Sequence, residues 1–423
     1  MRSLSIGALV AIAVIIGASF YVVTNFDSEI AQPSNSEESS NVGSIVDFND
    51  SVNGFAFDIY REMYNDPNNS GNIFISPYSI FTALAMTYEG ARNITAEEMR
   101  NVLNIEQDNG SFHKYMQGLY SLFNKNNVST ANALWPKIGF HLLQSYVNTI
   151  ETYYGGRVSE VDYSNPEKAA DIINSWVENK TNNLIHDLVP PNAIDPDLTM
   201  LILTNAIYFK GIWKIQFDDD NTTDRLFTTS SGKKINVSTM CLTNTKNLFN
   251  YTETSKMQIL ELPYSDSNIS MLIFLPKKGY TVVDVIDYLN KETFSNLIDS
   301  MSEKRVDIYL PKFEIKTPLY TLNDYLIDLG MPTAFSDNAD FSGIDGAKDL
   351  YISKVLHKAF IEVNEEGTEA AAATAVIMPL KYGGGSSSSS RIIFDCNHPF
   401  IFVIYHKETN TILFMGNVND PSE

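Results

Sequence analysis

The strongest constraint on the fold is one apolar run near the middle of the chain, LTMLILTNAIYF, at residues 198–209. The run contains no charged residue, includes several β-branched residues and shows no alternation of polar and apolar positions. A strand of this kind is covered on both faces, because a half-exposed strand would alternate. The chain must therefore build a sheet with further layers packed against each side.

Helix patterns come mostly before this run and strand patterns mostly after it. Apolar residues recur at helical spacing in four segments, at 48–64, 78–87, 141–153 and 167–184. Strand-like runs occur at 72–75, 258–263, 269–275, 305–310, 353–363, 400–405 and 412–416. Thr95 followed by Glu98 predicts a capping box that opens a further helix. Because helices and strands do not alternate as βαβ units, the order favours an α+β fold with mixed or antiparallel sheets.

The N-terminal region carries a different signal. Residues 4–23 hold no charge, and these 20 residues are long enough to cross a bilayer as a helix. Arg2 lies before them and Asp27 after them, which favours an exported body. Residues 1–26 are therefore a signal peptide or a signal anchor; we favour an uncleaved anchor, with residues 4–23 as its membrane contact. The body is then extracytoplasmic, either membrane-anchored or secreted.

Composition sets the remaining boundaries of the chain. Residues 27–44, rich in Ser, Glu and Asn, are expected to be a disordered linker. No linker interrupts the following body before Gly383, so residues 45–423 are expected to form a single domain. The two cysteines, Cys241 and Cys396, are expected to be free thiols rather than a disulfide.

Charge and motif content exclude several classes of function. The formal net charge is −21, with 51 acidic against 30 basic residues, so nucleic acid is not an expected partner. The six histidines show no metal-ligand spacing, and no phosphate-binding, hydrolase or metalloprotease motif occurs. We therefore expect no catalytic residues, no cofactor and no metal.

The most unusual segment lies near the C-terminus, EEGTEAAAATAVIMPLKYGGGSSSSSR, at residues 365–391. Its four consecutive alanines, at 370–373, are compatible with a short helix, a spacer or a strand. Thr374, Val376 and Ile377 follow them without a helix-favouring charge, which weighs against a surface helix. The Gly/Ser run at 383–390 has the composition of a linker.

Seven motifs resemble segments of one family, the serpins. They are NIFISPYSI (72–80), LTNAIYFKGIWKIQFD (203–218), ELPYSDSNISMLIFLPKK (261–278), LPKFEI (310–315), LGMPTAFSDNADFSGI (329–344), HKAFIEVNEEGTEAAAATA (357–375) and HPFIFVIYHKETNTILFMGNV (398–418). They occur in the order found in that family and cover about residues 45–420. The resemblance implies three β-sheets, eight or nine helices and an exposed reactive-centre loop at about residues 365–391.

The resemblance also implies a function. A serpin of the inhibitory kind is a suicide substrate: a serine protease cleaves the reactive loop, the loop inserts into the main sheet, and the protease stays bound as a covalent acyl complex. The chain would act as a monomer.

The resemblance also indicates where the loop is cleaved. Counting from Gly367 by the family's spacing places the scissile bond between Lys381 and Tyr382, which favours trypsin-like targets. A shift of one residue would favour subtilisin-like or chymotrypsin-like targets. Cysteine proteases, or a non-inhibitory serpin that acts as a binding or chaperone-like module, are the alternatives.

Several residues take roles from the same resemblance. The hinge, which must enter the sheet, comprises Glu366, Gly367, Thr368, Glu369, Ala370, Ala371, Ala372 and Ala373. Ser76, Ser79, Asn205 and His357 match the family's shutter, a polar cluster beneath the strands that separate, and Trp213 matches the breach, where insertion begins. In an inserted strand, one face would carry Thr368, Ala370, Ala372, Thr374 and Val376, all small or β-branched.

Overall fold

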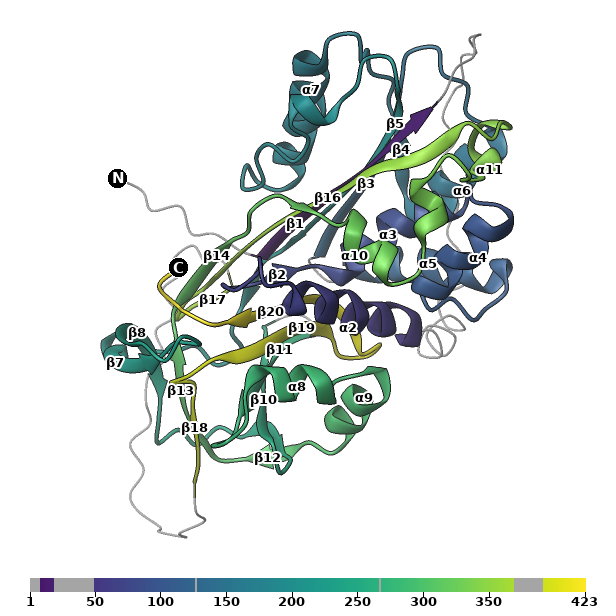
Figure 1. Cartoon of the computed structure of the whole chain (residues 1–423). Helices are drawn as coiled ribbons and strands as arrows, with labels where there is room; N and C mark the ends of the chain where they lie inside the picture. The colour runs from purple at the N-terminus through teal and green to yellow at the C-terminus, as the bar shows by residue number, and fades with distance from the viewer. Residues whose placement is uncertain (1–7, 19–48, 126–127, 266–267, 369–390) are drawn as a thin grey trace.

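The structure, a computed structural model, describes residues 8–18, 49–125, 128–265, 268–368 and 391–423 (Figure 1). Within these ranges it contains ten α-helices, one more than the upper expectation. They are α2 (Asn49–Asn65), α3 (Pro77–Tyr88), α4 (Asn93–Val102), α5 (Asn109–Lys125), α6 (Gln144–Tyr154), α7 (Pro166–Lys180), α8 (Val282–Tyr288), α9 (Lys291–Asp299), α10 (Asn323–Asp328) and α11 (Ser342–Asp345). The four segments with helical spacing correspond to α2, α3, α6 and α7, so those predictions are confirmed.

The largest structural feature is a seven-stranded sheet, which we call the central sheet. Its strands follow the order β14 (Phe313–Lys316), β16 (Leu350–Val363), β1 (Ala8–Ala18), β5 (Thr199–Phe209), β3 (Val128–Pro136) and β4 (Gly156–Val158), with β15 (Tyr320–Thr321) also paired to β16. The β3–β4 pair is parallel and the other pairs are antiparallel, as expected for a mixed sheet.

Three further sheets complete the described strands. A second seven-stranded sheet has the order β12 (Ser302–Lys304), β9 (Phe249–Glu253), β10 (Met257–Pro263), β11 (Ile269–Pro276), β19 (Phe400–His406), β20 (Thr411–Val418) and β2 (Phe74–Ile75). A four-stranded sheet has the order β18 (Ile392–Asp395), β13 (Val306–Pro311), β8 (Lys234–Leu242) and β7 (Thr223–Thr228). The fourth sheet is a single pair, β17 (Gly367–Thr368) with β6 (Gly211–Ile212). The expected α+β class with mixed and antiparallel sheets is confirmed, and the described strands form one sheet more than the three expected.

Strand β5 is covered on both faces, as its sequence predicts. Leu203 and Ile207 belong to the main hydrophobic core, which includes the residues of α3. Ile202 and Ala206 belong to a second buried cluster, which includes residues of α7. Figure 1 shows α7 on one side of the central sheet and α3 on the other. The alternation of two buried faces explains why no polar period is visible in the sequence.

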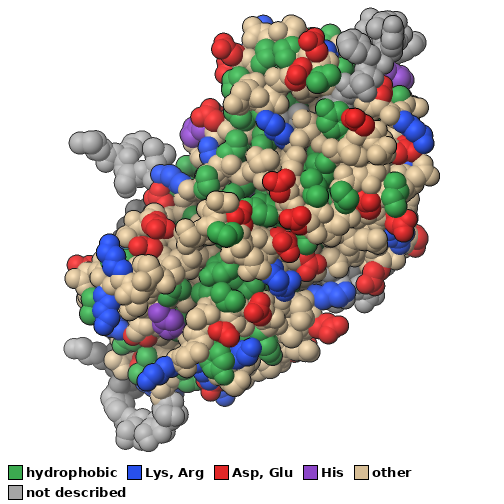
Figure 2. All heavy atoms as spheres, in the orientation of Figure 1, with side chains coloured by type: hydrophobic (Ala, Val, Ile, Leu, Met, Phe, Trp, Pro, Cys, Tyr) green, Lys and Arg blue, Asp and Glu red, His purple; other side chains and the backbone are tan. Residues whose placement is uncertain are grey.

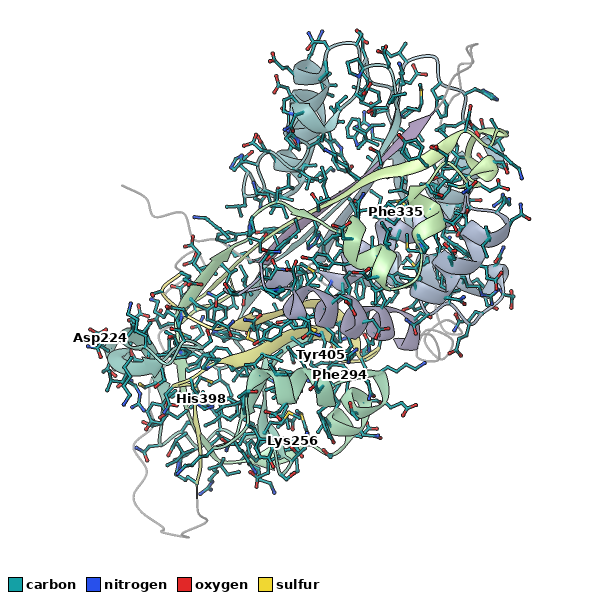
Figure 3. All side chains as sticks on the ribbon, in the orientation of Figure 1. Asp224, Lys256, Phe294, Phe335, His398 and Tyr405 are labelled. Carbon is teal, nitrogen blue, oxygen red and sulfur yellow. The ribbon has the colours of Figure 1, made fainter. Side chains whose placement is uncertain are left out.

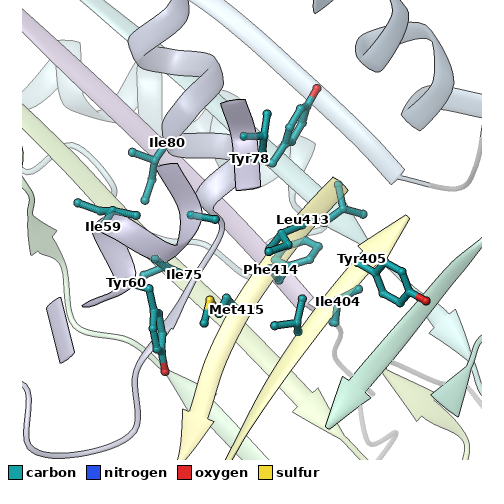
Figure 4. Close-up of a cluster of buried hydrophobic side chains, with 14 of the residues drawn as sticks. Ile59, Tyr60, Ile75, Tyr78, Ile80, Ile404, Tyr405, Leu413, Phe414 and Met415 are labelled. Carbon is teal, nitrogen blue, oxygen red and sulfur yellow. The ribbon is translucent and has the colours of Figure 1, made fainter. Parts of the chain in front are cut away.

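The main core joins the two large sheets through α2 and α3. Ile59 of α2, Ile80 of α3 and Phe414 of β20 belong to one cluster of buried side chains (Figure 4), and all three are fully buried. On the other side of the second sheet, Phe294 of α9 packs edge-on against Tyr405 of β19, with ring centroids 6.0 Å apart (Figure 3). Aromatic contacts of this kind fix how the helices sit on the sheet.

Two local predictions can be checked directly. The capping box of Thr95 and Glu98 is wrong, because α4 begins two residues before Thr95. The Thr95 hydroxyl instead accepts the backbone N–H of Asp340 at 2.9 Å, and the Glu98 carboxylate accepts two hydrogen bonds from Thr333. Tertiary partners thus replace the local cap. The prediction for the cysteines is confirmed: Cys241 and Cys396 are both free.

The membrane helix expected in residues 4–23 finds no support. Residues 8–18 form β1, which is hydrogen-bonded to β16 on one side and to β5 on the other. The segment is rich in valine and isoleucine, which fit a strand buried between neighbours better than they fit a helix. Among the residues that the structure describes, no helix is both long and apolar enough to span a bilayer.

Candidate functional site

The candidate site is the region of the central sheet between β5 and β16, which we call the insertion slot, together with the residues around its two ends. Strand β5 supplies Asn205 and β16 supplies His357, and both residues face the N-terminal end of α3. At one end of the slot, β6 continues from β5 after a single residue, Lys210, and pairs with β17. Strands β5 and β6 therefore connect the shutter residue Asn205 directly to the strand that pairs with the hinge.

The four shutter residues meet beneath the slot, as the sequence predicts. Ser76 is the N-cap of α3, and its hydroxyl accepts the backbone N–H of Ser79 at 3.1 Å and donates to the Leu413 carbonyl at 2.6 Å. The Ser79 hydroxyl donates to the side-chain oxygen of Asn205. The backbone N–H of Ser76 donates to Nε2 of His357 at 3.3 Å. All four residues are completely buried, so these bonds offset the cost of removing the polar groups from water.

His357 keeps one unused hydrogen-bonding atom. Its Nε2 accepts from Ser76, so in the neutral ring Nδ1 carries the proton. Nδ1 is buried and has no partner among the described residues. Burial lowers the pKa of His357 to about 3, so the ring is neutral at physiological pH. The shutter thus presents a buried N–H donor in the row of residues that borders the slot.

One shutter residue was missed by sequence reasoning. Asn132 of β3 accepts the side-chain N–H of Asn205 at 2.5 Å, and its own amide donates to the Tyr154 carbonyl at 2.5 Å. Asn132 lies directly opposite Asn205 in the β3–β5 register. The two asparagines are 73 residues apart in the chain, so no spacing rule connects them. They extend the polar cluster from the slot toward α6.

The breach residue, Trp213, holds the start of the hinge. Its indole N–H donates to the Asn364 carbonyl at 2.9 Å, and its backbone N–H donates to the Glu366 carbonyl at 2.9 Å. Its ring stacks on Tyr264 with centroids 4.5 Å apart. Tyr264 in turn shares a hydrogen bond of 2.7 Å with the Thr368 hydroxyl. Trp213 is therefore both a core aromatic and a clamp on the residues that lead into the loop.

The first hinge residues already belong to a sheet. Gly367 pairs with Ile212 and Thr368 with Gly211, and the Thr368 side chain is fully buried. Gly367 has a φ of 156°, and a Cβ at this position would lie 2.1 Å from the Gly211 carbonyl oxygen. Only glycine allows the two backbones to approach so closely. The hinge is therefore already strand-paired at Gly367 and Thr368, beside the end of the central sheet's slot.

An ion pair fixes the residue just before the hinge. The Glu365 carboxylate lies 2.6 Å from Nζ of Lys312 and accepts the Thr222 hydroxyl at 2.7 Å. Burial alone would raise the pKa of Glu365, but the hydrogen bonds from Lys312 and Thr222 outweigh it, so the pKa is lowered. Sequence reasoning missed Lys312 and Tyr264 as site residues, although both lie within the family-like motifs LPKFEI and ELPYSD.

Several predicted site residues lie outside the described residues. They are Glu369, Ala370, Ala371, Ala372 and Ala373 of the hinge and the proposed scissile pair Lys381 and Tyr382. The expected linker at residues 27–44 also lies outside them. Across the described part of the chain, no group of three or more His, Cys, Asp or Glu residues is arranged to hold a metal ion.

Comparison with known proteins gives one consistent result. A family model described as "Serpin (serine protease inhibitor)" matches residues 50–421. An uncharacterized serpin-like protein of Thermococcus kodakarensis is 41% identical over 378 residues, covering 88% of this chain and 85% of the relative. Human Serpin B3 is 37% identical over 390 residues, covering 87% of this chain and 97% of the relative. The solved structure "Cleaved Serpin 42Da" has a TM-score of 0.80 at 31% identity, covering 90% of this chain and all of the other.

The burial of neutral His357 predicts a pH dependence of stability. Its folded-state pKa lies below the value of the unfolded chain, so its stabilising effect is present above about pH 6.5 and declines as the pH falls toward 3. Below about pH 6 the loss is about 1.4 kcal/mol per pH unit for each such histidine. The measurement is the free energy of unfolding in urea between pH 7 and pH 5. His357→Gln should reduce the fall in the free energy of unfolding between pH 7 and pH 5 without abolishing it. The remaining fall is expected because His406 is also buried, which lowers its pKa to about 4.

His186→Gln is the matched control, because the His186 side chain is 54% exposed. It should leave the pH dependence of the free energy of unfolding unchanged. An identical pH dependence in the wild-type chain and in His357→Gln would contradict the assignment of a buried, neutral His357.

Proposed function

This chain belongs to the serpin family, and we propose that it inhibits serine proteases as a suicide substrate. The observation that carries the proposal is the hinge. Gly367 and Thr368 are paired with β6 at the end of the insertion slot, in line with the position that a new strand would take. The residues that follow in the sequence are small or β-branched up to Val376, apart from Glu369. Such residues can enter a packed sheet without a large cavity or a buried charge on the core face.

The proposed reaction uses the chain as a substrate and the protease as the catalyst. The protease's serine hydroxyl attacks the carbonyl carbon of the bait residue, and the peptide bond to the next residue breaks. The new amine leaves with a proton from the protease's histidine, and an ester joins the bait residue to the protease. The freed hinge side of the loop then enters the insertion slot before water hydrolyses the ester. Inhibition therefore depends on the rate of insertion relative to the rate of hydrolysis.

We further propose that the bait residue is Lys381 and the target protease is trypsin-like. The support is the family's spacing from Gly367 and the cationic side chain, which suits a primary pocket with a carboxylate. If the bond lies one residue away, Leu380 or Tyr382 becomes the bait and the target is subtilisin-like or chymotrypsin-like. Trapping of cysteine proteases is a further alternative.

The second candidate is a non-inhibitory serpin that binds a partner or assists folding. It would need no loop insertion and would tolerate bulky residues at the hinge. The small residues at 370–373 and the burial of Thr368 favour the inhibitor. On the face shown in Figure 2, basic and acidic side chains are intermingled, so this face has no cationic patch for a polyanion.

We also propose that the body works outside the cytoplasm. The support is the charge pattern at the N-terminus, where Arg2 precedes and Asp27 follows the uncharged residues 4–23. Separation of expressing cells into cytoplasm, membranes and exterior tests this location. Recovery of the whole chain in the cytoplasm would contradict it.

Thr368→Arg tests insertion. The Thr368 side chain is fully buried and bonded to Tyr264, so an arginine there would place an unpaired charge in the core and disrupt the β17–β6 pair from which the loop would continue into the slot. In a chain beginning at Ser44, the variant should still be cleaved, but the fraction of cleavage events that end in a covalent complex should fall by about tenfold or more. The measurement is a denaturing gel of inhibitor and protease. Thr368→Ser, which keeps the hydroxyl, should trap the protease normally. Stable complexes with Thr368→Arg would refute insertion.

Lys381→Ala tests the bait residue. Removing the ammonium group leaves the pocket carboxylate unpaired, which should cost on the order of 2–5 kcal/mol in recognition. In the chain beginning at Ser44, the rate of inhibition of trypsin-like proteases should therefore fall by more than an order of magnitude, whereas Lys168→Ala, on the exposed surface of α7, should leave it unchanged. Mass spectrometry of the released C-terminal fragment locates the bond. A fragment that begins at Tyr382 supports the assignment, and one that begins at Lys381 or Gly383 moves the bait residue and excludes it.

A further inference from the structure

The insertion slot is already filled in this structure. Strand β1 lies between β5 and β16 and pairs with both along its length, with Ala8 opposite Phe209 and Ala18 opposite Leu350. It is antiparallel to both neighbours and runs away from the end where the hinge enters. A loop that entered from the hinge would run in the same direction. The N-terminal segment thus occupies the place and the orientation that the inserted loop requires.

The register of β1 matches the register that the loop would adopt. Thr368 lies opposite Gly211, so a strand continued from it without a bulge would place Ala370 opposite Phe209. Ala8 occupies that position, two residues beyond Thr368 in this register. Continued further, the same register would set residues 370–380 in the positions held by residues 8–18. The two segments cannot both lie in the slot.

The two segments also resemble each other in sequence when they are compared in this register. Residues 11–15 read Ala-Ile-Ala-Val-Ile, and residues 373–377 read Ala-Thr-Ala-Val-Ile, so four of five positions are identical. Ala8 and Ala370 are identical as well. The register comes from backbone pairing alone, so this similarity is an independent observation. Both segments offer small and β-branched residues to the same two neighbouring strands.

The one difference within the shared stretch falls on the shutter. Ile12 lies opposite Asn205 on one side and opposite His357 on the other. The loop residue in that register is Thr374, whose hydroxyl oxygen can accept the N–H at Nδ1 of His357. Isoleucine has no polar side-chain atom, and Nδ1 is unpartnered among the described residues. At this position the loop sequence therefore offers His357 a hydrogen-bond partner, whereas the sequence of β1 has an apolar residue.

We propose that the insertion slot is a binding site for residues 8–18 of this same chain, and that this strand competes with the reactive loop. While β1 is in place, a protease that cleaves the loop is released, because the loop has no space to insert. Withdrawal or removal of the segment opens the slot and turns the chain from a substrate into an inhibitor. This consequence for inhibition rests on the proposed function, whereas the occupancy of the slot does not. Residues 4–23 cannot lie in a bilayer and in the sheet at once.

The experiment compares four chains made without detergent: the full chain, a chain beginning at Ser44, and the full-chain variants Ile12→Asp and Ser36→Asp, neither of which adds a site for trypsin. Ile12→Asp puts a charged residue opposite Asn205 and His357 in the register, and Ser36→Asp is the matched control outside β1. Each chain is incubated with trypsin, and the ratio of covalent complex to cleaved chain is measured. The thermal midpoint of each chain is measured as well.

The inference predicts that the chain beginning at Ser44 and Ile12→Asp trap trypsin at least tenfold more efficiently per cleavage than the full chain and Ser36→Asp. It also predicts that the chain beginning at Ser44 unfolds about 10 °C or more below the full chain, because the slot loses its strand. A synthetic peptide of residues 8–18 with an aspartate tag should restore the midpoint and abolish trapping.

The other possible outcomes separate the inference about the slot from the proposed inhibitory function. Equal trapping by the full chain and the chain beginning at Ser44 would overturn the inference and leave the proposed function standing. Recovery of the full chain only in the membrane fraction would also overturn it. If no chain traps any of a panel of serine proteases, the proposed function fails. The occupancy of the slot is then judged by the thermal midpoints alone, where a fall that the peptide reverses supports it and equal midpoints refute it.

Discussion

The rest of the structure depends on the backbone pairing along β5 and β16. Both strands are buried at the centre of the molecule, and each has a row of N–H and C=O groups that faces the slot between them. Buried backbone groups without partners are costly, so a slot of this kind favours any strand that can reach it. In a serpin this open pairing drives the insertion of the cleaved loop. In this chain residues 8–18 satisfy the same groups.

Two polar clusters border the slot. At its middle, Ser76, Ser79, Asn205 and His357 bond to one another across α3, β5 and β16, where a purely apolar core would offer no directional contacts. At the end where the hinge lies, Trp213 and Tyr264 hold the hinge by hydrogen bonds and ring stacking. The apolar layers stabilise the sheet, and the two polar clusters give it directional contacts at fixed positions along the slot.

Local patterns in the sequence predicted much of this molecule, because much of it follows local rules. The apolar run of β5 and the helical spacing of α2 each reported on a single segment. Asn132, Tyr264 and Lys312 were missed because their partners lie 53 to 104 residues away in the chain. The capping box failed for the same reason, since Thr95 and Glu98 bond to Asp340 and Thr333. Residues 4–23 show the limit most clearly: their composition suits a bilayer or a buried sheet, and only the pairing partners distinguish the two.

The central claim is that one slot holds one strand at a time. Amide hydrogen exchange after protease cleavage tests it most directly, because it reports which segment is hydrogen-bonded between β5 and β16. In the cleaved full chain, residues 8–18 should be protected and residues 370–380 should exchange freely. In the cleaved chain that begins at Ser44, residues 370–380 should become protected. Protection of both segments in the same cleaved molecule, or free exchange of residues 8–18 in the intact full chain, would contradict the account.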